Sequence, residues 1–262
     1  MSKLDEVAIA NQKLWENEVE KRCGYTTPWL HLDISSLQQF ARGELEILPE
    51  PISCMYPAYI LADVWGKSVL CLASGGGQQS AIFGLLGAQV IVADLTEGQL
   101  AGDRRAADYY GYEVITIQAD MRDLSALADD SFDLVYQANS VAYVPDVRAV
   151  YKEVSRVLKP GGFYRVCVSQ PSIHFTEWNG DDYIIAKPYR EKRQYRSDGG
   201  IEFRHNMEDL FNGLLDSGLV IHRIHEAPYA HLPHYLKAQP GSWNHERAFV
   251  AGEFVIVTQK PL

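Results

Sequence analysis

Three consecutive glycines, Gly75, Gly76 and Gly77, follow the apolar run VLCLAS, and Asp94 closes the next apolar run, AQVIVAD. Glycine permits positive φ and carries no side chain that would block a ligand. The free N–H groups of a helix that begins at Gln78 favour negative or polar ligand atoms. A carboxylate at the end of the second run can accept hydrogen bonds from both hydroxyls of a ribose. We therefore expect a ribose-containing ligand here, with a tight turn and a capping aspartate as the structural alternatives.

A second acid narrows the choice of ligand. The glycine pattern is an incomplete dinucleotide fingerprint, because Ser80 stands where the third glycine would be. NAD and S-adenosylmethionine both carry a ribose that Asp94 could bind. Asp120, followed by the apolar Met121, closes a third run and could bind the amino group and the face of an adenine.

Histidines and aromatic residues are candidates for binding a second molecule. The segment from Tyr229 to Glu246 joins the last two predicted strands, and it leaves the sheet on the ligand side if the sixth strand runs parallel to the earlier ones. Because it is long for such a connection, we expect it to cover an acceptor pocket. The catalytic candidates are His174, His231 and His234, and the substrate-binding candidates are Tyr25, Trp29, Tyr143, Tyr229, Tyr235 and Trp243.

The spacing H-x-x-H occurs twice, at 222–225 and at 231–234. Strand residues three positions apart point to opposite faces, so the first pair does not converge. We therefore predict no metal site.

The elements that position these residues alternate between strands and helices. Apolar runs predict strands at 68–73, 89–94, 113–118, 132–137, 162–169, 219–225 and 249–258. Helical periodicity predicts helices at 78–86, 97–110, 146–158 and 206–217. This order predicts a doubly wound α/β fold: a mostly parallel seven-stranded sheet with helices on both faces and a final antiparallel strand.

The chain divides into a predicted N-terminal helical cover, 1–60, and an α/β domain, 61–262, that binds the ligand. The apolar face of the first helix indicates either simple docking on the body or a lid over the site. Residues 170–205 form a predicted excursion, with a hairpin turn at 197–200 between the segments DYIIAKPY and GIEFRHN.

Composition excludes several classes of function. The 262 residues carry a net charge of −10, which disfavours nucleic acid and anionic membranes as partners. No apolar stretch is long enough for a membrane span, and the first residues lack an apolar signal core. Four scattered cysteines form no disulfide framework. We therefore expect a cytoplasmic protein.

Five segments, taken in order, resemble the class I S-adenosylmethionine-dependent methyltransferases. They are LCLASGGGQ, VIVADLTEGQL, IQADMRDL, SFDLVYQAN and LKPGGFYRV, and they cover about Ser68 to Val168. Each is modestly specific alone, whereas five at the usual spacing are strong evidence. The chain departs from the family at Cys71, where an acid is common, and at Ala73, where glycine is usual.

The resemblance implies S-adenosylmethionine as cofactor and S-adenosylhomocysteine as product. It implies that the glycine loop approaches the methionine part, that Asp94 with Leu95 holds the ribose, and that Asp120 with Met121 holds the adenine. The full set that it implies for the cofactor is Ala73, Ser74, Gly75, Gly77, Gln78, Asp94, Leu95, Asp120, Met121, Gln137 and Ala138.

The resemblance implies methyl transfer to an oxygen or nitrogen atom of a small molecule. Such a reaction depends on alignment, so a dedicated catalytic base is not required. The alternatives are a nicotinamide-dependent oxidoreductase and a non-catalytic binding protein with the methyltransferase fold.

Overall fold

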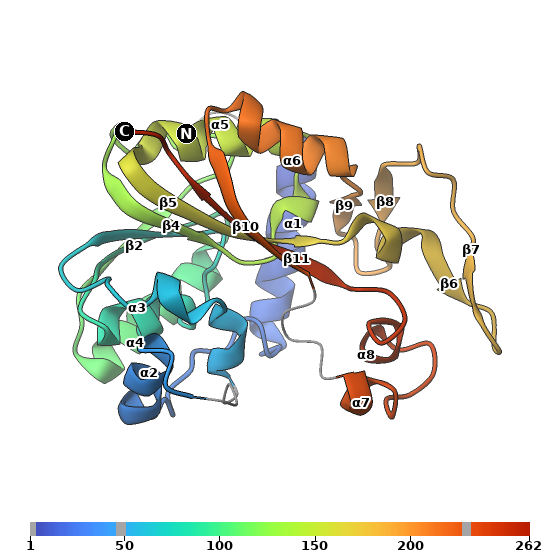
Figure 1. Cartoon of the computed structure of the whole chain (residues 1–262), viewed down its shortest axis with the longest axis horizontal. Helices are drawn as coiled ribbons and strands as arrows, with labels where there is room; N and C mark the ends of the chain where they lie inside the picture. The colour runs from blue at the N-terminus through green and yellow to red at the C-terminus, as the bar shows by residue number, and fades with distance from the viewer. Residues whose placement is uncertain (1–3, 46–50, 227–231) are drawn as a thin grey trace.

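The computed structural model describes residues 4–45, 51–226 and 232–262 (Figure 1). Its central sheet has seven strands in the order β10-β11-β5-β4-β1-β2-β3. The strands are β1 (Ser68–Leu72), β2 (Gln89–Asp94), β3 (Val114–Gln118), β4 (Phe132–Gln137), β5 (Leu158–Ser169), β10 (Val220–Glu226) and β11 (Glu253–Gln259). The predicted fold class is confirmed.

Strand directions place most carboxyl ends at one edge of the sheet. Strands β1 to β5 pair in parallel, whereas β11 is antiparallel to both β5 and β10. Strand β10 therefore runs in the same direction as β1 to β5. The connection from β10 to β11 consequently starts at the edge where the glycine loop lies.

Helices cover both faces of the sheet because strand residues alternate in direction. Figure 1 shows α5 (Val147–Val157) and α6 (Met207–Asp216) above the sheet. Below it lie α2 (Ile34–Ala41), α3 (Gln79–Leu85) and α4 (Glu97–Tyr110). In β1, Leu70 and Leu72 pack in the core under α5 and α6, whereas Val69 and Cys71 pack in the opposite core.

Two strands begin four residues away from their predicted starts. Strand β5 begins at Leu158 rather than 162, because Leu158 already pairs with Phe132 ahead of a register shift. Strand β11 begins at Glu253 rather than 249. The N–H groups of Phe249 and Val250 instead donate to the Glu246 carbonyl and extend the turn of α8 (Trp243–Glu246).

The N-terminal region lies over the body of the protein. Helix α1 (Glu6–Glu20) buries Val7, Ala8, Asn11 and Leu14. The Asn11 amide donates to the carbonyls of Tyr143 and Ile201, and its oxygen accepts from the Ile201 N–H. Short 3₁₀ helices η1 (Ile52–Met55) and η2 (Ala58–Ile60) lead into β1. Helix α1 is therefore held by buried polar contacts; the cover-and-domain division itself stays a prediction.

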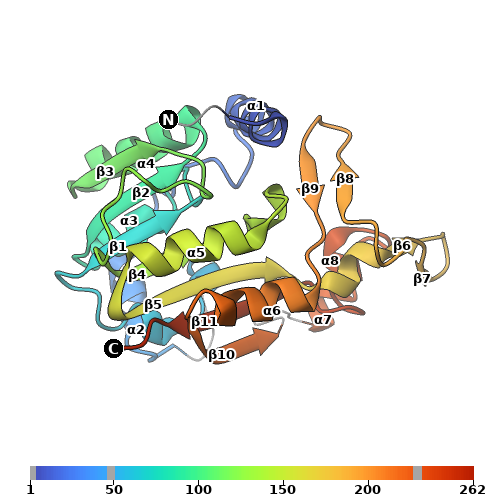
Figure 2. The same ribbon diagram turned by 90° about the horizontal axis from the view of Figure 1, so that it is seen from above.

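The excursion after β5 forms two hairpins rather than the one predicted. Strand β6 (Thr176–Trp178) pairs with β7 (Tyr183–Ile185), and β8 (Arg193–Tyr195) pairs with β9 (Ile201–Phe203). The turn at 197–200 is where it was predicted, but its first strand is 193–195 rather than 182–189. The reason is a second turn, closed by the Asn179 N–H donating to the Asp182 carbonyl, which pairs β7 with β6. Both hairpins project beyond the sheet, and β8–β9 lies next to α1 (Figure 2).

The remaining short elements lie around the ligand edge. They are η3 (Val141–Tyr143), η4 (Pro171–Phe175), α7 (Leu232–Tyr235) and α8.

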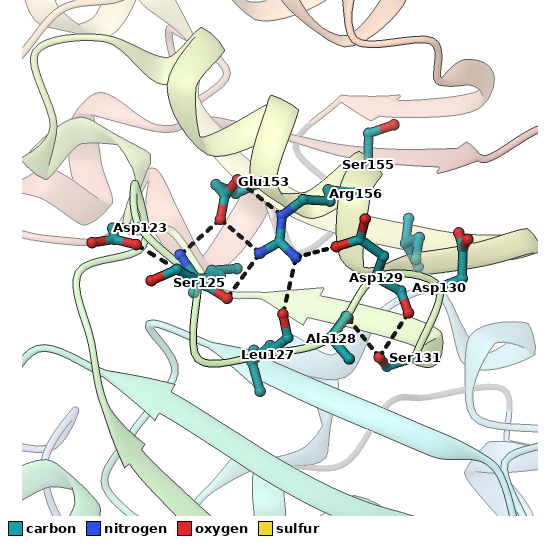
Figure 3. A network of polar contacts seen from close by, with 12 residues as sticks. Asp123, Ser125, Leu127, Ala128, Asp129, Asp130, Ser131, Glu153, Ser155 and Arg156 are labelled. Carbon is teal, nitrogen blue, oxygen red and sulfur yellow. Dashed lines mark hydrogen bonds and ion pairs between the residues drawn. The ribbon is translucent and has the colours of Figure 1, made fainter. Parts of the chain in front are cut away.

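A polar network holds the last turn of helix α5 in place (Figure 3). The Arg156 guanidinium donates to the carbonyls of Leu124 and Leu127 and to the carboxylates of Glu153 and Asp129. It ties the loop between β3 and β4 to the last turn of α5.

Within the described ranges, no helix is long and apolar enough to cross a membrane. All four cysteines are free thiols.

Candidate functional site

A cavity of about 1010 Å³ opens at the carboxyl ends of the parallel strands. The loops after β1, β2, β3 and β4 line one half of it. The second half is lined by β5, the excursion, α8 and β11, and N-terminal residues close over both. One continuous cavity thus joins the glycine loop to a second region that could hold another molecule.

Asp94 connects the end of β2 to the glycine loop. Its carboxylate accepts from the Gly75 N–H at 3.1 Å and from the Thr96 N–H at 2.9 Å. Burial raises the pKa of Asp94 to about 6, although these two hydrogen bonds favour the ionised form. A Cβ on Gly75 would lie 3.0 Å from an Asp94 oxygen and 2.6 Å from the Gln99 Cβ. Glycine at 75 is therefore required for the backbone to approach this carboxylate.

Gly77 faces helix α4 and does not line the cavity. Its φ is +77°, and an added Cβ would lie 2.9 Å from the Gly102 carbonyl carbon and closer still to the oxygen. We expected a side chain at Gly77 to occupy ligand space. In the structure it would instead separate the loop from α4, so the glycine is required by loop–helix packing.

Asp103, which the sequence interpretation missed, lies beneath the loop. Its carboxylate accepts from the N–H groups of Gly76 at 3.1 Å and Gly77 at 3.0 Å and from the Ser80 hydroxyl at 2.5 Å. Burial raises the pKa of Asp103 to about 7, with the Asp94 charge adding to the rise and the Ser80 hydrogen bond opposing it. Its signal in the sequence is weak: one acid in a helix that also carries several exposed charged residues.

The third-strand acid is held by an arginine. Asp120 lines the cavity, and the Arg122 guanidinium donates to both of its oxygens at 2.5–3.1 Å. Arg122 also donates to Asp5, the N-cap of α1, so the helix is tied to the end of β3. Met121 lines the cavity beside Asp120.

The other predicted cofactor residues divide between cavity and core. The cavity lining includes Ala73, Ser74, Gln78, Leu95 and Ala138. Gln137 is fully buried in the core, where its side chain accepts from the Tyr164 hydroxyl and donates to the Ser140 hydroxyl. It does not line the cavity.

The N-terminal region contacts the glycine loop directly. The Gln78 amide donates to the carbonyls of Gly24 and Thr27 at 2.6 and 3.0 Å. The Trp29 N–H donates to the Gly77 carbonyl at 3.2 Å. Tyr25 and Trp29, which the sequence suggested as substrate-binding residues, both line the cavity beside the glycine loop, and that role stays a prediction.

The second half of the cavity carries two buried arginines. Arg165 on β5 donates to the carbonyls of Tyr56, Cys54 and Gln137, and its guanidinium lies 4.6 Å from the centre of the Tyr136 ring. Arg247 forms a 3.3 Å ion pair with Glu253, in which both side chains are at least 85% buried.

Polar groups at the ends of β4, β5 and β11 complete this second half. The Asn139 amide donates to Ser169 and to Glu253, both at 3.2 Å. His174, on η4, also lines it, and burial together with the charge of Arg204 lowers its pKa to about 4. At neutral pH its ring is therefore uncharged.

The remaining candidates are only partly placed. Tyr143, Tyr235 and Trp243 line the cavity, whereas His234 is exposed and does not. Tyr229 and His231 lie outside the described residues. Among the described residues, no three His, Cys, Asp or Glu side chains gather as they would to hold a metal ion.

Comparison with known proteins places residues 70–166 in a family model described as a methyltransferase domain. The chain is 30% identical over 230 residues to YbaJ of Bacillus subtilis, named as an uncharacterized methyltransferase; the match covers 82% of this chain and 89% of that protein. It is 31% identical over 126 residues to a ubiquinone biosynthesis O-methyltransferase of Pseudomonas syringae, covering 47% of this chain and 54% of that one.

The fold is similar to the crystal structure of an S-adenosylmethionine-dependent methyltransferase from Mesorhizobium loti. The TM-score is 0.62 at 22% identity, with 88% of this chain and all of that chain covered.

Proposed function

The chain belongs to the class I S-adenosylmethionine-dependent methyltransferases, and from that premise we propose that it methylates an oxygen or nitrogen atom of a small molecule. The observation that carries the proposal is the single cavity that joins the glycine loop to a second polar region. Its volume of about 1010 Å³ lies at the upper end of the range of about 300–1000 Å³ for ligand pockets, which leaves room for two small ligands held side by side.

The residues around Asp94 fit the cofactor. The buried Asp94 carboxylate already accepts two backbone N–H groups and interacts with the Thr96 side chain, which leaves acceptor capacity for a ribose hydroxyl. Two further buried amide oxygens, of Gln79 and Gln99, lack a hydrogen-bond partner among the described residues, and both residues line the cavity. This set of acceptors suits a ligand rich in hydroxyl and amino donors.

S-adenosylmethionine, when bound, supplies a methyl group attached to a sulfonium. What the chain contributes is alignment and exclusion of water. Helix α1, the residues after it and the excursion close over the cavity, while the glycine loop and Asp94 orient one side. Aromatic lining residues, including Tyr25, Trp29 and Tyr143, suit a partly apolar acceptor.

His174 is the group we propose to orient the acceptor. Its ring is neutral at physiological pH because of burial and the nearby positive charge of Arg204. A neutral ring can accept a hydrogen bond from a hydroxyl or an amine and so direct a lone pair of that atom. With a pKa of about 4 it is a weak base, so orientation is its expected contribution.

The likeness to the Pseudomonas syringae enzyme supports a hydroxyl acceptor, since that relative is named as an O-methyltransferase. The net charge of −10 supports a small-molecule acceptor over nucleic acid. A cytoplasmic location stays a prediction.

The test is a panel of small phenols, alcohols and amines incubated with S-adenosylmethionine, with S-adenosylhomocysteine and methylated product measured by mass spectrometry. We expect turnover of at least one hydroxyl or amine. Methylation of a protein or nucleic acid with no turnover across a broad panel would refute the proposal.

A matched pair of variants then tests His174. His174→Ala is expected to lower kcat by about tenfold or more while the affinity for S-adenosylhomocysteine changes less than about threefold. His222→Ala, on the exposed strand β10, is the control and should leave both unchanged. Normal kinetics of His174→Ala would remove this residue from the site.

A further inference from the structure

Asp103 on helix α4 receives three hydrogen bonds from the glycine loop and the start of α3. The donors are the N–H groups of Gly76 and Gly77 and the Ser80 hydroxyl, and Ser80 in turn accepts from the Tyr112 hydroxyl. Asp103 is fully buried and does not line the cavity. It therefore acts on the loop rather than on a bound ligand.

We propose that Asp103 is a positioning residue for the cofactor: its ionised carboxylate holds the glycine loop in the conformation that presents Gly75 and Asp94 to the cavity. The inference rests on the cofactor half of the proposed function. It is independent of the nature of the methyl acceptor.

The packing of loop and helix explains why a tether is needed. Gly76 and Gly102 lie backbone to backbone, since a Cβ on Gly102 would lie 2.9 Å from the Gly76 carbon and oxygen atoms. The surfaces in contact carry no side chains at these positions and so bury little apolar area. Apart from the hydrogen bond from the Gly76 N–H to the Gln99 carbonyl, the hydrogen bonds that join α4 to the loop among the described residues are those of Asp103.

Strand β1, which ends at the loop, carries no acid that could do this. Strand β1 contributes Cys71, whose side chain packs in the core on the α3 side and whose pKa is raised by burial and by the Asp103 charge. A neutral thiol is a weak hydrogen-bond acceptor, whereas a carboxylate bound to N–H groups forms charge-assisted bonds. Asp103 thus supplies from α4 a negative charge that β1 lacks.

Keeping the buried Asp103 carboxylate ionised costs free energy in the folded protein. The hydrogen bonds of Asp103 can therefore hold the loop in place without adding to the stability of the fold. Asp103 forms no ion pair within the described ranges, and the ionisable groups that act on it are Asp94, Cys71 and Tyr112. Both Asp94 and burial favour its protonated form. Protonation removes a lone pair from an oxygen that is surrounded by donors, so the loop should loosen as the pH falls through about 7.

The experiment compares Asp103→Asn with Asp108→Asn, the same change at an exposed position on the same helix. Calorimetry measures S-adenosylhomocysteine binding from about pH 8 to about pH 6, and thermal unfolding is followed in parallel. We expect Asp103→Asn to weaken binding by about tenfold or more at pH 8, because the amide replaces one acceptor oxygen with an NH₂ donor that faces the loop. Tm should change little, because the substitution also removes a buried charge and its free-energy cost. Asp108→Asn should match the wild type.

The pH profile is the readout that a merely structural role would not move. Wild-type affinity should fall as the pH drops through about 7, and Asp103→Asn should lose that part of the dependence. If Asp103→Asn fails to fold, Ser80→Ala serves instead. Because it removes a donor that favours the ionised carboxylate, the fall in affinity should move to higher pH.

Binding by Asp103→Asn within about threefold of the wild type, or an unchanged profile in Ser80→Ala, would overturn the inference. A wild-type protein that binds no S-adenosylhomocysteine would overturn the cofactor assignment as well. Failure of the acceptor panel alone would affect only the proposed substrate class.

Discussion

Replacing Asp94 with asparagine should separate cofactor affinity from the stability of the fold. The carboxylate accepts from Gly75 and Thr96 in the free protein and has lone pairs left for a ribose. Hydrogen bonds to a charged acceptor contribute about 1.5–3 kcal/mol each, and an amide retains only one acceptor atom. We therefore expect the variant to lose about 2–4 kcal/mol of binding free energy, which corresponds to a roughly 30- to 1000-fold weaker affinity.

Stability should change much less, because two effects oppose each other. The rise of the Asp94 pKa from 3.8 to about 6 corresponds to about 3 kcal/mol against the ionised form in the fold, and asparagine removes that cost. The new NH₂ group faces one backbone N–H, which costs about 1–3 kcal/mol. The net change is expected within about 2 kcal/mol, or roughly 4–8 °C in Tm for a domain of this size.

The assay is calorimetric titration with S-adenosylhomocysteine at about pH 8, together with thermal unfolding of the free protein. Asp133→Asn is the matched control, since Asp133 also accepts from a backbone N–H, that of Ser68, but lies at the opposite end of the sheet. The control should lower Tm and keep the affinity. An Asp94→Asn protein with wild-type affinity would refute the assigned role and leave Asp94 as a cap for the loop after β2.

Three further outcomes follow from the packing and charges. Gly77→Ala should abolish S-adenosylhomocysteine binding, because its Cβ would press on the Gly102 carbonyl. The control Gly111→Ala, at a similar φ of +75° but with open space around the new Cβ, should lower the stability of the fold by only about 1 kcal/mol. Equal effects of the two variants on binding in calorimetry would contradict the packing argument. Arg156→Ala should lower the free energy of unfolding in urea by about 2–4 kcal/mol and leave cofactor affinity intact, because it removes the hydrogen bonds and ion pairs at the end of α5. The control is Arg42→Ala, which removes an exposed ion pair. A smaller effect of Arg156→Ala than of the control would show that the Arg156 network does not stabilise the fold. Because the folded pKa values of Asp94 and Asp103 lie above 3.8, their contribution to stability is complete below about pH 4 and is lost as the pH rises through 6 and 7. The free protein should therefore lose part of its Tm between about pH 4 and 7, and Asp103→Asn should lose less; an identical decline in both would exclude Asp103 as a source.

The local patterns of the chain were sufficient to predict the order along the chain of the seven strands of the central sheet and of the helices α3, α4, α5 and α6 between them. Continuous apolar runs between helical periods specify buried parallel strands, and the sheet has the predicted class. The strand-end positions of Asp94 and Asp120 and the glycine run could likewise be read locally, because parallel strands bring their carboxyl ends to one edge. These features depend on periodicity of two or 3.6 residues and on residue types that terminate an element.

Contacts between distant segments were decided only by the tertiary structure. The turn at 197–200 was visible in the sequence, but which strands it joined depended on a competing turn at Asn179. Asp103 looks like one more polar residue on a charged helix, and only the docking of α4 against Gly76 and Gly77 buries it beneath the loop. The same docking gives Gly77 its role, since the atoms that exclude a side chain belong to Gly102. A pattern along the chain records which residues an element exposes, whereas the partner that covers them is set when the elements pack.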